Sequence, residues 1–309
     1  MKRLAAVALI LVLLLTCSGC GRNAQHTFFC MDTVMDVQLW GKDAKEAVGY
    51  MQFVISGLES TWSATDDNSL VANLNRGADV TLDMPQQALL LKIEELSQRT
   101  HGAFDPQLGA LTAAWGFYED NYRIPTSEEI EKAIASAQWD LGAAMKGYAG
   151  TKCVEALEKF HVDRGILNLG GNIQTYGEKA DGTPWQIGIR NPDGGDYIGM
   201  VSVEGTAAVV TSGDYQRYFE YDGIRYHHIM DPKTGYPADS GVRSVTVICR
   251  DGLTADVLST ALFVMGLEEG SDLWRESEDF EAVFILTTGE IYATEGAKLS
   301  GCDYEVIKR

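Results

Sequence analysis

The feature that most constrains the fold is a series of short β-rich segments between residues 165 and 249, separated by glycine-containing turns. Short apolar runs bounded by such turns are typical of strands. We predict strands at 165–169, 185–190, 198–204, 206–211, 217–221 and 243–249. Strands that follow one another closely along a chain can pair antiparallel through short turns, so a mainly antiparallel sheet is expected.

Helical patterns lie on both sides of this series. Apolar residues recur every three or four positions at 44–58, which predicts an amphipathic helix. Further helices are predicted at 85–99, from Ser127 onward, at 150–160 and at 255–265, with a β-rich stretch at 27–40 and a hairpin at 281–292. There is no long linker and no repeat, so we expect one α+β domain, residues 27–309, in which helices pack on the sheet.

The N-terminus has the pattern of an export signal. A lysine and an arginine precede an apolar run that is too short to span a bilayer stably, and a small residue with Cys20 follows. We expect a signal peptide at residues 1–19, lipidation of Cys20 and a tether at residues 20–26. The mature protein would then be extracytoplasmic, anchored by its lipid to the bacterial membrane. Lipidation of Cys17, or a plain signal peptide, are the alternatives.

The mature chain is strongly acidic. Removal of Lys2 and Arg3 with the signal leaves 23 of the 25 Lys and Arg residues against 44 Asp and Glu, so the formal net charge changes from −19 to −21. Nucleic acid is therefore not an expected partner, because phosphate backbones require a basic surface. The remaining cysteines form no C-x-x-C pair and are expected to be buried or incidental thiols: Cys30, Cys153, Cys249 and Cys302.

The stretch from Tyr226 to Pro237 is dense in reactive side chains, with two adjacent histidines, an aspartate, a lysine and a tyrosine. Proline and glycine fix the backbone of such a stretch into turns. Binding and catalytic groups are often carried by loops held in this way. Taken alone, the stretch is equally compatible with an ordinary loop that exposes its histidines.

About twenty residues later, Asp256 and Thr260 lie four positions apart in a predicted helix. This spacing places a carboxylate and a hydroxyl on one helix face. Both are hard oxygen donors of the kind that Mg²⁺ prefers. The alternative is that Asp256 interacts with the dipole of the helix N-terminus and that Thr260 only packs.

Four further segments place polar groups beside small residues. In Asp140–Tyr148, Lys146 could bind phosphate, although a helix start with a solvated lysine is an alternative. Leu169–Asn172 and Thr211–Tyr215 could offer backbone groups to an anion, but neither is a G-x-G-x-x-G or G-x-S-x-G motif. Thr100–Pro106 could pack against a planar ring or form a turn around a core phenylalanine.

The order of these segments resembles the ApbE family, the FAD:protein FMN transferases, which are exported flavin-transfer lipoproteins of bacteria. The resemblance extends from about Thr27 to about Met265 and implies an ApbE-like (T-fold-like) version of the α+β fold. The matching segments are Met31–Thr33, Gly102–Pro106, Lys146–Ala149, Asn168–Asn172, Thr211–Tyr215, His228–Gly235 and Ala255–Ala261.

The resemblance implies a Mg²⁺-dependent transfer of FMN from FAD to a threonine hydroxyl of a target protein, with release of AMP. It implies that Asp256, Thr260 and the backbone carbonyl of Ala143 hold the metal, and that Asp256 and His228 are catalytic. The residues implied to bind FAD are Met31, Ala103, Phe104, Asp105, Asp140, Lys146, His228 and Ile229. The resemblance implies that the acceptor is a subunit of a membrane-bound electron-transfer complex or an extracytoplasmic reductase.

One segment departs from the family pattern. The family often has an aromatic residue shortly after the serine of a segment like Trp62–Thr65, and this chain has Thr65 there, with Trp62 as a candidate replacement. Two other functions use the same residues. The chain could be an FAD pyrophosphatase, with water as the acceptor, or a non-enzymatic lipoprotein that binds flavin.

Overall fold

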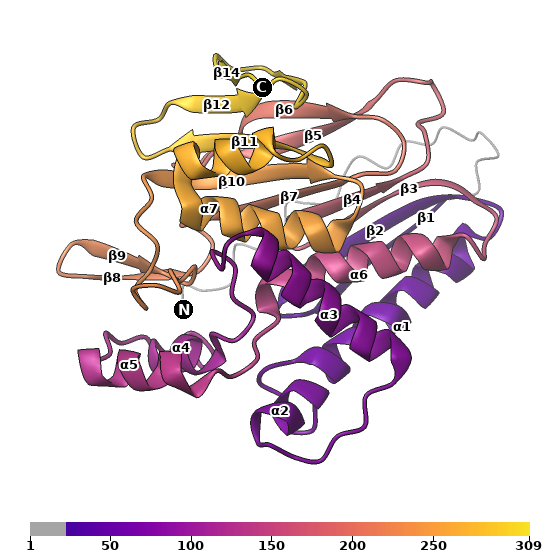
Figure 1. Cartoon of the computed structure of the whole chain (residues 1–309). Coiled ribbons are helices and arrows are strands. Elements are labelled where there is room, and N and C mark those ends of the chain that lie inside the picture. Colours follow the sequence, from indigo (N-terminus) through magenta and orange to yellow (C-terminus); the bar gives the residue numbers. More distant parts are fainter. Residues whose placement is uncertain (1–22) are drawn as a thin grey trace, which may run out of the picture.

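The computed structural model describes residues 23–309, and its main element is a nine-stranded sheet (Figure 1). Neighbouring strands are antiparallel, apart from the parallel pair of the last two. Their order across the sheet is β1 (Asn23–Cys30), β2 (Thr33–Gly41), β3 (Val162–Leu169), β4 (Asn172–Tyr176), β7 (Ala208–Gly213), β10 (Val242–Cys249), β11 (Phe280–Leu286), β12 (Ile291–Thr294) and β14 (Glu305–Ile307). The predicted α+β fold with a mainly antiparallel sheet is confirmed.

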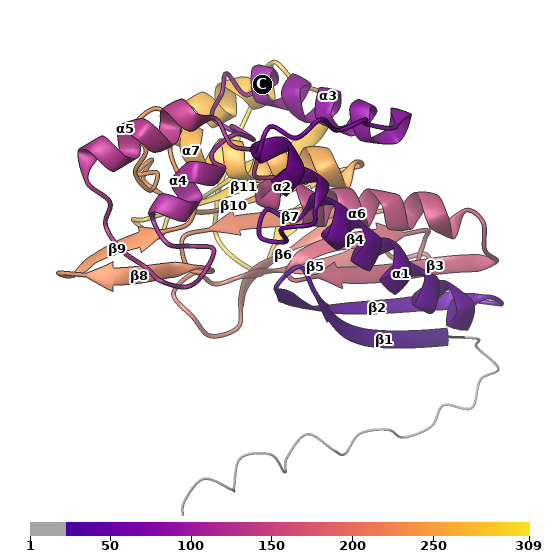
Figure 2. The same ribbon diagram turned by 90° about the horizontal axis from the view of Figure 1, so that it is seen from below.

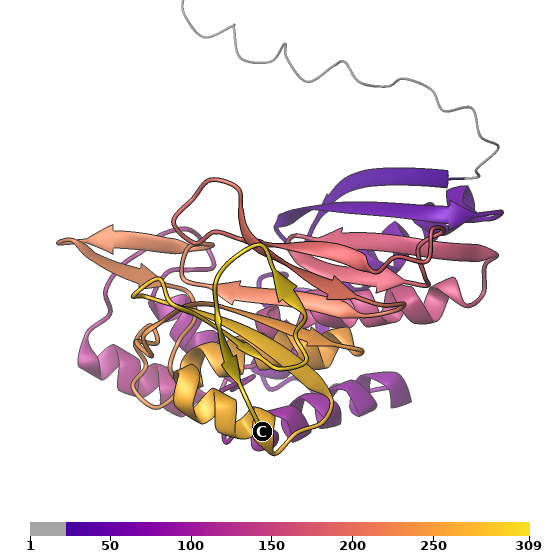
Figure 3. The ribbon, with the colours of Figure 1, turned by 90° about the horizontal axis from the view of Figure 1, so that it is seen from above.

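Helices cover one face of this sheet, as both edge-on views show (Figures 2 and 3). They are α1 (Ala44–Trp62), α2 (Leu70–Asn75), α3 (Met84–Arg99), α4 (Gly109–Ala114), α5 (Ser127–Ser136), α6 (Gly142–Leu157) and α7 (Gly252–Arg275). One buried cluster joins α1 and α6 to the inner face of β1–β3. Another joins α7 to β7, β10 and β11. Both clusters bury apolar faces whose periodicity is visible in the sequence.

A smaller sheet packs on the opposite face. It has the order β13 (Leu299–Ser300), β6 (Tyr197–Val203) and β5 (Trp185–Arg190). Its apolar side chains meet the outer face of the main sheet in a third buried cluster. A separate hairpin of β8 (Tyr218–Tyr221) and β9 (Ile224–His227) projects beside α4 and α5 (Figure 1).

Several predicted boundaries are corrected by the structure. Helix α6 begins at Gly142, so the glycine-rich segment expected before it forms its first turns. Helix α5 does begin at Ser127 as predicted, and Thr126 before it forms a full capping box with Glu129. Helix α7 continues well past residue 265, with non-helical backbone at Gly266. Residues 23–26, assigned to a tether from the sequence, already belong to β1.

Helices α6 and α7 cross at a pair of glycines, and this crossing shapes the site described below. A Cβ atom on Gly147 would collide with the carbonyl of Gly252, and one on Gly252 would collide with the carbonyl of Gly147. Only glycine allows two helix backbones to approach so closely. The Thr151 hydroxyl donates to the Asp251 carboxylate at 2.8 Å, which ties the two helices together next to the crossing.

The four cysteines of the described chain are unpaired, and Cys30, Cys153 and Cys249 are buried. Burial raises the pKa of the Cys153 thiol to about 12, as expected for an inert core residue. None of the helices between residues 23 and 309 is both long enough and apolar enough to cross a membrane. The predicted signal peptide and Cys20 lie outside the described residues.

Candidate active site

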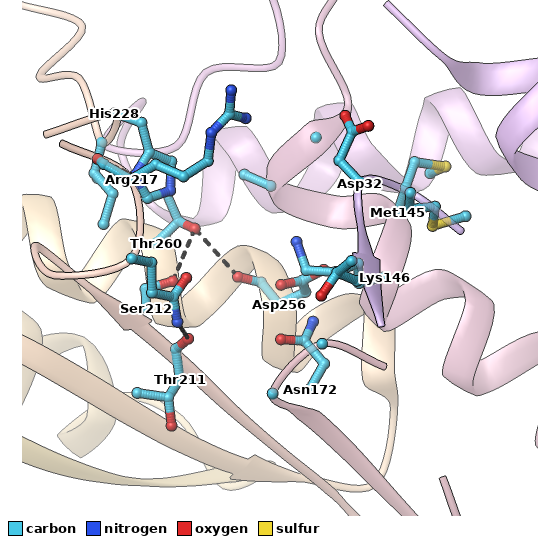
Figure 4. A pocket seen from close by; sticks show the side chains of 18 of the residues that line it. Asp32, Met145, Lys146, Asn172, Thr211, Ser212, Arg217, His228, Asp256 and Thr260 are labelled. Atoms are coloured by element: carbon cyan, nitrogen blue, oxygen red, sulfur yellow. Dashed lines mark hydrogen bonds between the residues drawn. The ribbon is translucent and has the colours of Figure 1, made fainter. Parts of the chain in front are cut away.

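A cleft of about 1230 Å³ opens between the helical layer and the ends of β2, β3, β4 and β7. The structure brings to this cleft all the described residues that the sequence resemblance selects. They are Met31, Ala103, Phe104, Asp105, Asp140, Ala143, Lys146, His228, Ile229, Asp256 and Thr260. In Figure 4, Lys146, Asp256, Thr260 and Ser212 face a common space, with His228 and Arg217 to one side of it.

Asp256 is the buried acid of the cleft, with 4 % of its surface exposed. Its Oδ2 accepts the N–H of Gly147 at 2.7 Å across the helix crossing. Burial raises the pKa of Asp256, while the charge of Lys146 and the Gly147 N–H act in the opposite direction. The alternative role at the helix N-terminus is wrong, because Asp251 is the N-cap and accepts the N–H of Thr254 at 3.0 Å.

Thr260 lies one turn after Asp256 and is joined to β7 by a chain of hydroxyls. Ser212 Oγ lies 3.2 Å from Thr260 Oγ1 and 2.8 Å from Ser259 Oγ. Thr260 Oγ1 also donates to the Asp256 carbonyl at 3.4 Å. The Thr260 hydroxyl is therefore hydrogen-bonded at the cleft wall, and its role as a metal ligand stays a prediction.

This donor set fits a magnesium ion that keeps several ligands from solvent or substrate. The described residues contain no group of three or more His, Cys, Asp and Glu that could hold a metal. Mg²⁺ is commonly bound by one or two carboxylates together with phosphate oxygens and waters. The carboxylate of Asp256, the hydroxyl of Thr260 and the carbonyl of Ala143 all belong to the cleft. In a regular helix that carbonyl would bond the Gly147 N–H, which here donates to Asp256.

The two adjacent histidines have different environments. His227 is buried and its Nε2 lies 3.1 Å from the Ala238 carbonyl, so it belongs to the core. His228 lines the cleft, and its Nδ1 lies 3.2 Å from the Arg217 carbonyl. A carbonyl only accepts hydrogen bonds, so Nδ1 carries the proton and Nε2 keeps a lone pair. Desolvation lowers the pKa of His228 to about 3, with repulsion from Arg217 as a smaller cause, and its ring is neutral at pH 7.

Asp140 is oriented before any ligand binds. It accepts the hydroxyl of Tyr118 at 2.8 Å and the N–H of Gly142 at 2.8 Å. Burial and the neighbouring carboxylate raise the pKa of Tyr118, which therefore stays a hydrogen-bond donor. Lys146, in α6, is half-buried in the cleft wall. The alternative of a helix start is right for this segment, and phosphate binding by Lys146 stays a prediction.

The turn that precedes Asp105 contributes backbone more than side chains. His101 and Gly102 are in left-handed conformations, with φ of 52° and 75°. The ring of Phe104 is 2 % exposed and packs in the helical core, and its carbonyl accepts the Ser97 hydroxyl at 2.8 Å. The alternative of a turn around a core phenylalanine is therefore correct for the ring, while Ala103 and Asp105 remain at the cleft.

Glu59 is a cleft residue that the sequence did not single out. Its Oε1 accepts the N–H of Met31 at 2.6 Å, and its Oε2 accepts the Cys30 thiol at 2.9 Å. Met31 and Asp32, with φ of 49° and 56°, close the β1–β2 hairpin in a left-handed turn. Glu59 therefore fixes the backbone at which Met31 meets the cleft. No motif marks it, since it is one of many glutamates on helices.

Asn172, Arg217 and Tyr118 also line the cleft without having been assigned a role. Asn172 is 5 % exposed, and its side-chain amide lies close enough to Asp256 to help lower the pKa of that carboxyl. Its Nδ2 forms no well-aligned hydrogen bond among residues 23–309, and a ligand oxygen would satisfy it. The glycine turn before Asn172 was the signal that could have selected it.

Trp62 does not replace the missing aromatic residue near Thr65. Its ring is 4 % exposed and belongs to the buried cluster under α3 and α6. Trp62 also lines the cleft, but so little of it is exposed that it lacks a free face for stacking. Thr65 is exposed on the cleft wall, where its N–H donates to Ser63 Oγ at 3.2 Å.

The chain is similar to several known proteins over most of its length. A protein named FAD:protein FMN transferase from Treponema pallidum is 32 % identical, over 95 % of this chain and 93 % of its own length. One of the same name from Klebsiella pneumoniae is 32 % identical over 90 % and 94 %. The crystal structure of the ApbE protein of Thermotoga maritima is 33 % identical and superimposes with a TM-score of 0.81, covering 89 % of this chain and 97 % of that one. The flavin transferase ApbE of Vibrio cholerae is 25 % identical with a TM-score of 0.79, over 90 % and 99 %. The sequence model of the ApbE family matches residues 31–284, and the chain belongs to that family.

Proposed function

We propose that this protein is an FAD:protein FMN transferase, which moves FMN from FAD to a threonine hydroxyl of an extracytoplasmic protein and releases AMP. The observation that carries the proposal is the convergence of Asp256, Thr260, Lys146 and His228 on one cleft. The names of the relatives in Treponema pallidum and Klebsiella pneumoniae support the same reaction.

In this reaction the acceptor oxygen attacks the phosphorus of the FMN half. A P–O bond of the pyrophosphate breaks, AMP leaves with the bridging oxygen, and the acceptor proton must be removed. Lys146 would supply positive charge next to the pyrophosphate, and the Nδ2 of Asn172, which forms no well-aligned hydrogen bond among residues 23–309, would supply a donor. Orientation of the two reactants and stabilisation of phosphate charge are the main contributions that a protein makes to phosphoryl transfer.

We assign removal of that proton to His228 and metal binding to Asp256. The ring of His228 is neutral in the free protein and its Nε2 lone pair is available. Bound pyrophosphate would bring negative charge beside the ring, which favours its protonated form during the reaction. Asp256, Thr260 and the Ala143 carbonyl would hold Mg²⁺, which neutralises charge on the phosphate oxygens.

The reaction can be tested with FAD as the added substrate. Membranes from cells that make the full chain are incubated with FAD and Mg²⁺, and proteins are examined for covalent flavin fluorescence and by mass spectrometry. The expected result is a threonine-containing peptide heavier by one FMN unit, with AMP released. Asp256→Ala should abolish both products. Asp303→Ala, which changes an exposed aspartate far along the chain, should leave both intact.

Other outcomes of this experiment have a defined meaning. Free FMN and AMP without a labelled protein would identify an FAD pyrophosphatase. FAD recovered unchanged, with equal binding in the presence and absence of Mg²⁺, would leave only a flavin-binding protein. Thr260→Val gives a second test of the metal site, because an unchanged Mg²⁺ affinity in that variant would remove Thr260 from it.

We also propose that the mature protein is a lipoprotein attached through Cys20 to the outer side of the cytoplasmic membrane or to the outer membrane. The support is the signal-like sequence of residues 1–20. Mass spectrometry of the purified protein should find a diacylated N-terminal cysteine. Cys20→Ser should release the protein from the membrane fraction, and a variant that stays bound would contradict the proposal.

A further inference from the structure

The cleft has a second arm that the proposed FAD and metal residues do not use. It continues past the Gly170–Gly171 turn to the outer face of the main sheet, where Ile166 and Asn168 line it. These two side chains alternate along β3 with Leu167 and Leu169, which pack under the helices. The total volume of about 1230 Å³ exceeds the roughly 300–1,000 Å³ typical of a small-molecule pocket. The cleft therefore has room for FAD and for part of a second substrate.

The wall of this arm is made by strands β5 and β6 and by Tyr215. Tyr197 is 71 % exposed, yet its ring lies on Gly188, where a Cβ atom would collide with it. The ring of Tyr215 lies in the same way on Gly213. The two aromatic rings, each packed on a glycine, line this wall together with the side chain of Arg190.

Arg190 is a cation without an ion-pair partner among residues 23–309 of this acidic protein. Its side chain is exposed, its guanidinium carbon lies 5.9 Å from the centre of the Tyr215 ring, and no ion pair joins it to any residue between 23 and 309. The other cations that line the cleft are Lys146, next to Asp256, and Arg217, which donates to the Phe117 carbonyl. Arg190 is therefore free to bind a carboxylate that another molecule brings.

The arm leads to the reaction centre. Tyr215 lies two residues after Gly213, the last residue of β7, and Ser212 lies just before it, with its hydroxyl 3.2 Å from Thr260 Oγ1. An extended chain over Tyr215 and Arg190 would place one of its side chains at Ser212. Such a chain advances about 3.3 Å per residue, so the residues that flank the one at Ser212 would lie along the arm.

We propose that this arm is the docking site of the flavin acceptor, which binds as an extended segment with a carboxylate side chain on Arg190 and its threonine at Ser212. The inference rests on the proposed transferase function. Tyr197 and Tyr215 cover the apolar parts of the segment, and Arg190 selects the residue that flanks the threonine. The arm contributes to binding of the acceptor and not to binding of FAD.

The test uses synthetic nine-residue peptides with one central threonine in an alanine–glycine background. Each peptide carries aspartate at one other position, with an asparagine version as its control. The full-length protein in detergent, FAD and Mg²⁺ are added, and the gain of one FMN mass unit is followed. We expect one aspartate position to raise the labelling rate about tenfold over asparagine, as for a charge-assisted hydrogen bond.

A charge-reversal variant then tests whether Arg190 recognises the aspartate of the peptide. Arg190→Glu should lose the preference for aspartate and gain one for lysine at the same position, with unchanged affinity for FAD. Tyr197→Ala should slow labelling of all the peptides. Lys159→Glu makes the same change of charge at an exposed residue outside the cleft and should behave as the unmodified protein.

Three results would overturn the proposal. Labelling that is insensitive to the aspartate position, or an Arg190→Glu variant that loses FAD affinity as strongly as labelling, would assign the arm to another role. Cleavage of FAD without labelling of any peptide would show that the arm is not a peptide site, while the FAD chemistry stands. Absence of FAD cleavage would instead contradict the proposed function itself.

Discussion

The N–H of Gly147 donates to the carboxylate of Asp256 at 2.7 Å, from one helix to another. This bond exists because two glycines let α6 and α7 meet backbone to backbone. It holds a carboxylate in the cleft at a place where burial alone would favour the protonated acid. The position of the expected metal ligand is thus set by helix packing and not by a loop.

Gly147→Ala should therefore be destabilising and also damage the site. The added Cβ would lie 2.5 Å from the Asp256 Cβ and collide with the Gly252 carbonyl, so the helices must separate. Overpacking of this kind costs about 1–3 kcal/mol. Denaturant unfolding should show this loss, and Mg²⁺ affinity should fall with it.

Gly49→Ala is the matched control for that change. Gly49 lies in α1, and a Cβ there would meet no atom within 4 Å. Alanine has the better helix propensity, so this variant should gain about 0.5–1 kcal/mol. Equal effects of the two variants would mean that the crossing tolerates a side chain.

Asp256→Asn should raise stability while it removes activity. The folded-state pKa of Asp256 is raised above its usual 3.8, so the ionised carboxylate weakens the folded state at neutral pH. The favourable contribution of this group is complete below pH 3.8 and is lost as the pH rises through the folded pKa. Asparagine keeps an oxygen for the Gly147 N–H, so the melting temperature at pH 7 should increase, with a smaller gain near pH 4.

The control for that variant is Asp251→Asn. Asp251 caps α7 and accepts from Thr254 and Thr151, so loss of its charge should leave the melting temperature unchanged or lower it. A lower melting temperature for Asp256→Asn at pH 7 would show that Lys146 and the backbone donor outweigh burial. It would contradict the view that the ionised Asp256 destabilises the folded protein and is kept for its function.

The sequence predicted the strands and the site segments better than it predicted how they meet. Periodicity selected the buried face of α1, because its apolar residues recur at helical spacing. It missed the first turns of α6, where glycine and alanine have no amphipathic pattern and the helix is set by its contact with α7. Tertiary packing decided that boundary.

The site residues that the sequence missed act through distant partners. Glu59 reaches Met31 from a separate element, and Tyr118 reaches Asp140 from a turn between helices. Neither belongs to a motif with fixed spacing, so no local pattern marks them. The two adjacent histidines could not be told apart from the sequence. Only the fold shows that His227 contacts the Ala238 carbonyl and that His228 lines the cleft.

Glu59→Ala should weaken binding of FAD without unfolding the protein. The Met31 N–H would lose its acceptor, and the left-handed turn at Met31 and Asp32 would be held less firmly. A hydrogen bond to a charged group contributes about 1.5–3 kcal/mol, so the dissociation constant for FAD should rise about tenfold or more. Calorimetric titration with FAD would measure it.

Glu94→Ala is a suitable comparison, since Glu94 is an exposed glutamate of α3 outside the cleft. This variant should bind FAD as the unmodified protein does. If Glu59→Ala also binds normally, the turn at Met31 does not depend on the carboxylate, and Glu59 has no positioning role.

The last prediction concerns the pH dependence that His228 gives to the protein. Its folded-state pKa of about 3 lies below the usual 6.5, so the unfolded chain binds more protons between these values. The stability associated with the neutral ring is complete above pH 6.5 and is lost as the pH falls towards 3. His228→Gln, which cannot be protonated, should therefore lose less stability than the unmodified protein between pH 6.5 and pH 4, as measured by thermal melting.

The pH profile of kcat/KM for FAD reports the ionisation of groups in the free enzyme. Because the His228 ring is neutral near pH 6.5, this profile should not fall on the acid side of that pH. His228→Gln should lower the rate at every pH from 5 to 8 without a change in the shape of the profile. His101→Asn, a change at an exposed turn residue, is the control for both measurements. An acid limb near pH 6.5 that disappears in His228→Gln would show that the ring titrates normally in the free protein, and that the surroundings of Arg217, His227 and Lys146 do not keep it neutral.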